Sequence, residues 1–114
     1  MIQVQFHFNK DSGSISLKIK GHAGQANPGH DIICASASIL SFTVAQIVKN
    51  VYTRKGLRKK PVVNMGNGDA TILCKPKEEY MDEVFHAFSV AQVGYQLLSH
   101  NYPQFVKLSM FGEA

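Results

Sequence analysis

The first twenty residues alternate between apolar and polar side chains, and this alternation limits the fold more than any other feature of the chain. The apolar members of the first run would share one face of an extended strand; they are Ile2, Val4, Phe6 and Phe8. A second run follows a turn that contains Gly13, and it consists of Ile15, Leu17 and Ile19. A period of two on both sides of a glycine-containing turn predicts an antiparallel hairpin with one buried face.

The rest of the chain predicts two long helices, a second hairpin and a closing strand. Residues 31–54 carry apolar side chains three or four positions apart, as on one face of a helix: Leu40, Val44, Ile47, Val48 and Val51. Residues 62–65 and 70–75 flank a glycine-rich turn and predict the second hairpin. Helical spacing returns over residues 76–100, and residues 105–111 predict a strand. The order ββαββαβ indicates an α+β fold in which a mostly antiparallel sheet packs with two long helices.

Length and composition indicate one ordinary globular domain over residues 1–114. Independent domains typically contain about 100–150 residues, and the chain is 45% hydrophobic and 18% charged, which excludes a disordered protein. No apolar stretch approaches the ~18 residues of a membrane helix. The N-terminus lacks the basic start and cleavage site of a secretion signal. We therefore expect a soluble cytoplasmic protein without a membrane partner.

Basic residues leave a binding function open. The chain has twelve Lys and Arg against eight Asp and Glu, for a net charge of +4, which permits an acidic partner without requiring one. Five cations fall within residues 54–60: Arg54, Lys55, Arg58, Lys59 and Lys60. They could contact phosphates, so a small ribosome-associated or RNA-binding module is an alternative function. Because the aromatic residues fall mostly on predicted core faces, we expect nucleic-acid binding to be weak at most.

Residues 21–38 contain the side chains that are most able to take part in catalysis. His22 follows a predicted strand, whereas Asp31 and Cys34 lie at the start of a predicted helix. With Asp31 as the N-cap, Cys34 would be the third helical residue, close to unpaired N–H groups and the positive end of the helix dipole. That setting favours a thiolate, and the same N–H groups could hold an oxyanion. A nearby histidine would supply a base.

Two other interpretations apply to these residues. A lone cysteine near a helix start is more often a small buried apolar residue, and a histidine after a strand is more often structural. His30 and Cys34 have the i,i+4 spacing of two zinc ligands, with His22 as a third. The chain has no CxxC or HExxH motif, however, so we expect no metal. Cys74 lies in a strand pattern and is expected in the core, and two cysteines are too few for a disulfide scaffold.

One family has a similar pattern. The block Gly21-His22-Ala23, followed by Gly29-x-Asp31-Ile32-Ile33-Cys34-Ala35 and Ser38, resembles the signature of the bacterial ribosomal-processing cysteine protease family, Prp. The similarity covers essentially the whole chain, up to Tyr102-Pro103-x-Phe105-Val106. The resemblance implies a cysteine endopeptidase that needs no cofactor, with Cys34 as nucleophile and His22 as catalytic histidine. It also implies supporting roles for Gly21, Asp31 and Ser38.

The resemblance further implies a substrate and an assembly. Members of the family remove the N-terminal extension of a large-subunit ribosomal protein, number twenty-seven in the standard series, cut after two aromatic residues and form homodimers. They have a mobile loop between the catalytic histidine and cysteine. Here that loop matches Ala23, Gly24, Gln25, Ala26, Asn27, Pro28, Gly29 and His30, and we expect it to gate the site.

Two supporting residues keep two interpretations each. Asp31 could cap the helix or orient His22 as the third member of a triad. Ser38 lies one helical turn after Cys34, so its hydroxyl could organise the site, or its small size could allow close helix packing.

Overall fold

The computed structural model describes residues 1–22, 28–66 and 68–113, with the side chains of residues 28–31 and 110–113 outside that description. Its elements are β1 (Ile2–Asn9), β2 (Ser14–Lys20), α1 (Pro28–Thr53), β3 (Val62–Gly66), β4 (Asp69–Cys74), the short 3₁₀ helix η1 (Glu78–Tyr80), α2 (Met81–Asn101) and β5 (Val106–Glu113). This order confirms the predicted α+β fold and its succession of strands and helices.

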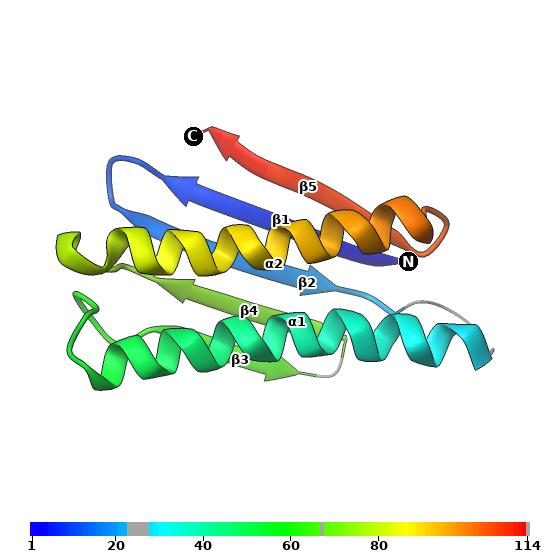
Figure 1. Cartoon of the computed structure of the whole chain (residues 1–114), viewed down its shortest axis with the longest axis horizontal. Helices are drawn as coiled ribbons and strands as arrows, with labels where there is room; N and C mark the ends of the chain where they lie inside the picture. The colour runs from blue at the N-terminus through cyan, green and yellow to red at the C-terminus, as the bar shows by residue number, and fades with distance from the viewer. Residues whose placement is uncertain (23–27, 67, 114) are drawn as a thin grey trace.

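The five strands form one sheet in the order β3-β4-β2-β1-β5, and both long helices lie along the same face of it (Figure 1). The pairs β1–β2, β2–β4 and β3–β4 are antiparallel, as expected. Strand β5 instead runs parallel to β1, so the sheet is mixed. A parallel neighbour requires a long crossover, and α2 provides it by returning the chain to the edge where β1 begins.

The core lies between the sheet and the two helices. The alternation of the first hairpin has the expected result, because the apolar side chains of one face are buried: Ile2, Val4, Phe6, Ile15, Leu17 and Ile19. Helix α1 contributes Val44, Val48 and Val51, and α2 contributes Val84, Phe88 and Tyr95. Burying one such side chain stabilises the fold by about 1.5–3 kcal/mol.

Tyr95 also ties the two helices together. Its ring meets that of Phe6 edge-on, with 6.0 Å between the ring centroids. Its hydroxyl donates a hydrogen bond of 2.7 Å to the carbonyl oxygen of Ala37 on α1. Since burial raises the pKa of Tyr95, the hydroxyl stays protonated and remains a donor at neutral pH. This contact fixes the first half of α1, which carries Cys34, against α2.

Helix α1 begins at Pro28, three residues before the predicted start. Proline fits the first turn of a helix because its fixed φ suits that position and its missing N–H has no helical partner there. Asp31 is therefore not the N-cap, and Cys34 is not the third helical residue but lies almost two turns into the helix. Pro28, Gly29 and His30 belong to this helix rather than to a loop. Residues 23–27 of the predicted gating loop lie outside the described residues.

The apolar character of α1 is greater than we expected from the sequence. Its segment Ile32–Thr53 has 22 residues and a mean hydropathy of 1.7, so by length and composition alone it could cross a membrane. The interrupting Ser, Thr, Gln and Asn lower the mean too little, because Lys49 is the only charged residue in the segment. Helices that pack in a protein core meet the same criterion, and in this fold Val44, Val48 and Val51 are buried against the sheet.

Candidate active site

His22 and Cys34 line one cavity of about 120 Å³. His22 lies two residues after the end of β2, and Cys34 lies on α1, so the cavity opens where the sheet meets this helix. Ser38 also lines it, one turn after Cys34. Gly21 lines it as well, so the structure places four of the predicted site residues around one space, although Cys34 and His22 are separated by eleven residues in the sequence.

Cys34 is a free, half-buried thiol. On the sheet-facing side of α1 its neighbours Ile33 and Ala37 are buried, which leaves Cys34 at the border between core and cavity. The unpaired N–H groups of a helix belong to its first four residues, here residues 29–31 because Pro28 has no N–H. Cys34 lies beyond them, so the predicted oxyanion site at the helix start does not follow from this geometry.

The backbone at His22 is held from two sides. The N–H of Gly21 donates to the carbonyl oxygen of Gly68 at 2.9 Å, and the amino group of Met1 donates to the carbonyl oxygen of His22 at 2.6 Å. Gly21 has a φ of 96°, and a Cβ there would lie 2.2 Å from the Met1 carbonyl oxygen. A glycine before His22 is therefore required by backbone conformation and by the close approach of Met1.

Cys74 provides the contrast. As predicted it lies in the core, on β4, with 2% of its surface exposed. Burial raises the pKa of its thiol to about 12. A thiol in that state is not a nucleophile at neutral pH, so Cys34 is the one cysteine of the chain that suits this role.

The cavity has further walls that the sequence interpretation missed. Phe42 follows Ser38 at the same four-residue spacing, so positions 34, 38 and 42 share one face of α1. This spacing could have identified Phe42 as a cavity residue from the sequence. Met65, Gly68 and Asp69 come from the β3–β4 hairpin, whose turn was assigned only a structural role. The pairing of β4 with β2 brings them to the cavity, and no local sequence pattern predicts that pairing.

Two other site predictions concern the role of Asp31 and a metal site. The side chain of Asp31 lies outside the described side chains, so its role toward His22 stays a prediction. Among the residues that the structure describes, no group of three His, Cys, Asp or Glu side chains is placed to hold a metal ion.

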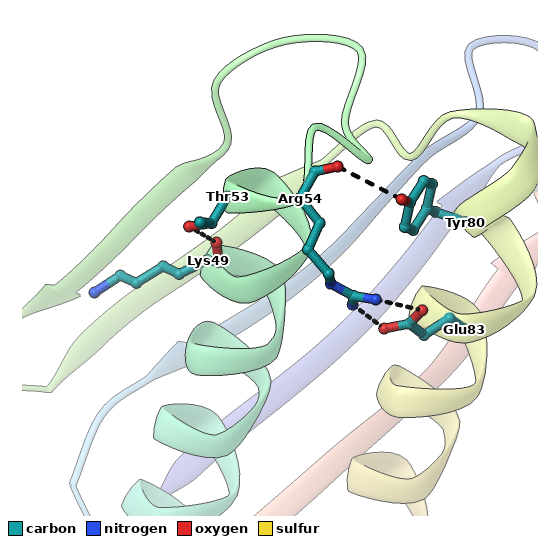
Figure 2. Close-up of polar contacts among 5 residues, drawn as sticks. All are labelled: Lys49, Thr53, Arg54, Tyr80 and Glu83. Carbon is teal, nitrogen blue, oxygen red and sulfur yellow. Dashed lines mark hydrogen bonds and ion pairs between the residues drawn. The ribbon is translucent and has the colours of Figure 1, made fainter.

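The basic segment follows the end of α1, whereas Cys34 and Ser38 lie in the first half of that helix (Figure 1). The Arg54 guanidinium forms an ion pair with the Glu83 carboxylate of α2 and lies 5.5 Å from the centroid of the Tyr80 ring (Figure 2). The Tyr80 hydroxyl donates to the Arg54 carbonyl oxygen at 3.5 Å. One of the five cations thus links the two helices, which favours a structural role for it over phosphate binding.

Comparison with known protein families finds one match for the chain. The profile of the cysteine protease Prp family matches residues 1–107. None of the curated proteins is similar enough to match.

Solved structures show the same fold over nearly the whole chain. The essential ribosomal processing protease Prp from S. aureus, in complex with a covalently linked product peptide, has a TM-score of 0.69 and 25% identity, covering 96% of this chain and 98% of that one. The protein SMU.848 from Streptococcus mutans has a TM-score of 0.68 and 25% identity, covering 97% and 94%. The S. aureus protease in complex with a substrate peptide has a TM-score of 0.67 and 23% identity, covering 96% and 98%.

Proposed function

Since the chain belongs to the cysteine protease Prp family, we propose that it removes the N-terminal extension of a large-subunit ribosomal protein, number twenty-seven in the standard series. The observation that carries this proposal is the shared cavity of His22 and Cys34. Further support comes from S. aureus, where a protein of similar fold is a ribosomal processing protease and has been solved with a substrate peptide and with a covalently linked product peptide. Such a protease would meet its substrate in the cytoplasm, where both free cysteines would stay reduced.

The reaction is an acyl transfer through Cys34. The thiolate attacks the carbonyl carbon of the scissile bond and forms a tetrahedral oxyanion. This intermediate collapses when the C–N bond breaks, and the His22 imidazolium gives its proton to the leaving amine. His22, now neutral, takes a proton from water, which attacks the thioester. The C–S bond breaks, the acid product leaves and the thiolate returns.

The oxyanion needs a donor other than the start of α1. Ser38 lines the same cavity as Cys34, and its hydroxyl can donate a hydrogen bond. We assign Ser38 this role, which replaces the predicted N–H groups of the helix start. A preorganised donor of this kind is typically worth about 10²–10³ in kcat.

The lining of the cavity suits an aromatic substrate residue. Ile2, Ile19, Phe42 and Met65 provide apolar surface beside His22 and Cys34. Aromatic side chains gain from contact with such surface and from ring–ring packing, for which Phe42 is available. This lining supports cleavage after a pair of aromatic residues.

The proposal is tested by mass spectrometry of a synthetic peptide that contains the ribosomal extension. We expect one cut after the aromatic pair with the wild-type protein and with Cys74→Ala, and none with Cys34→Ala or His22→Ala. Cleavage by Cys34→Ala would contradict the assignment of the nucleophile. An intact peptide with folded, reduced wild-type protein would contradict the function and favour the RNA-binding alternative, which a salt-dependent RNA-binding assay then tests.

We also propose a homodimer. Its support is an apolar surface on the outer sides of the two helices, where Ile39, Val90 and Leu97 are 62%, 57% and 59% exposed. The groove between the helices is lined by apolar side chains including Leu40, Ile47 and Ala87. Sedimentation should give twice the mass of the chain, and Val90→Glu should reduce it to the monomer. A wild-type monomer at every concentration would contradict the dimer.

A further inference from the structure

The imidazole ring of His22 lies against Gly68, in the turn between β3 and β4. A Cβ atom at position 68 would lie 2.4 Å from Nε2 and 2.8 Å from Cε1 of His22, which is far inside van der Waals contact. The ring therefore occupies the space that any side chain at position 68 would need. We propose that Gly68 is a positioning residue, which sets where the His22 imidazole lies beside the Cys34 cavity. This inference rests on the proposed function of His22.

The backbone around this contact is held on both sides. Strands β2 and β4 are paired up to Lys20 and Asp69. One residue further, the N–H of Gly21 donates to the carbonyl oxygen of Gly68 at 2.9 Å. These hydrogen bonds link the backbone next to His22 to the backbone of Gly68. Neither backbone can therefore move away from the other easily. The room left for the ring on this side thus depends on the residue at position 68.

A simpler explanation is that position 68 needs glycine only for its backbone. Its φ is 73°, in the left-handed region that disfavours other residues. Gly13, in the turn between β1 and β2, separates the two explanations because its φ is 72°. A Cβ at position 13 would lie 3.5 Å from Cε of Met81, which is ordinary contact. The two glycines share the backbone requirement, and His22 is close to only one of them.

An added methyl group at position 68 would displace the ring rather than unfold the protein. His22 is exposed, so its side chain can rotate away from the new group at little cost to folding. The displaced ring would no longer be aligned for either proton transfer. A misplacement of about 1 Å can lower a rate by about 10²-fold. The effect should fall on kcat, because other cavity residues would still bind the peptide.

The experiment compares Gly68→Ala with Gly13→Ala. Melting temperature, kcat and KM for the extension peptide are measured, together with the NMR resonance of the His22 Cε1 proton, assigned with His22→Ala. We expect equal decreases in melting temperature for the two variants. We expect a decrease in kcat of about 100-fold and a shifted His22 resonance in Gly68→Ala only. Wild-type kcat and an unshifted resonance in Gly68→Ala would overturn the inference.

Two additions keep the test decisive. If Gly68→Ala does not fold, Gly68→Asn and Gly13→Asn replace the alanine pair, because asparagine tolerates a positive φ and still introduces a Cβ. If the wild-type protein cuts no peptide, the proposed function fails, whereas the NMR comparison still decides whether Gly68 positions the ring. The two failures are therefore distinguishable.

Discussion

The two cysteines of this protein show how strongly position determines the chemistry of one side chain. Cys34 lies on α1 at the edge of a cavity and is half-buried, whereas Cys74 lies on β4 and is 2% exposed. The apolar surroundings of Cys74 oppose its negative form and raise its pKa to about 12. Cys34 has a histidine and a serine at the same cavity. The comparison shows that the polar side chains around a cysteine, and its access to a cavity, identify the reactive one.

Alkylation should give the largest difference between the two cysteines. With a pKa of about 12, roughly one Cys74 thiol in ten thousand is ionised at about pH 8, and that sulfur is also covered. We expect iodoacetamide to place one label per folded chain, on Cys34, and two labels in denaturant. Peptide mapping by mass spectrometry locates the label. A folded protein labelled at Cys74 would break the comparison.

The raised pKa also makes stability depend on pH. The Cys74 thiol ionises near 9.0 when free and near 12 when buried. An unfolded chain therefore loses this proton first, and its ionisation favours unfolding. The contribution of the protonated thiol to the free energy of unfolding is fully present below pH 9, and it is lost as the pH rises from 9 toward 12.

Serine substitution sharpens the same comparison at the level of stability. Cys74→Ser places a hydroxyl in the core where apolar side chains surround it, and it should lower the free energy of unfolding by about 1–3 kcal/mol. Cys34→Ser is the matched change at a half-exposed position and should lower it by less than about 0.5 kcal/mol. Urea denaturation measures both values. Equal losses would show that the two surroundings do not differ as the structure indicates.

The sequence predicts most of this fold because its strongest patterns are local. Alternation identifies the buried faces of β1 and β2, and helical spacing identifies the sheet-facing residues Val44, Val48 and Val51. The start of α1 was placed too late because Pro28 and Gly29 are typical loop residues, and a helix can nevertheless begin at a proline.

The site could be predicted only in part, for a different reason. His22, Cys34 and Ser38 belong to one short segment, and a family resemblance draws attention to them. Gly68 and Asp69 are at least thirty residues away in the sequence, and only the pairing of β2 with β4 brings them to the cavity. Strand register over such a separation depends on tertiary packing, which no local pattern reports.

The parallel pair of β1 and β5 has a consequence for how the protein is made. Ile2 pairs with Val106, so the outer edge of β1 stays unpaired until nearly the whole chain has been synthesised. Both hairpins and α1 can form before that moment, because their contacts are local. Until β5 arrives, β1 presents an open strand edge, which is a template for pairing with another chain. Translation at high concentration of nascent chains is therefore the stage at which this small protein is most exposed to aggregation.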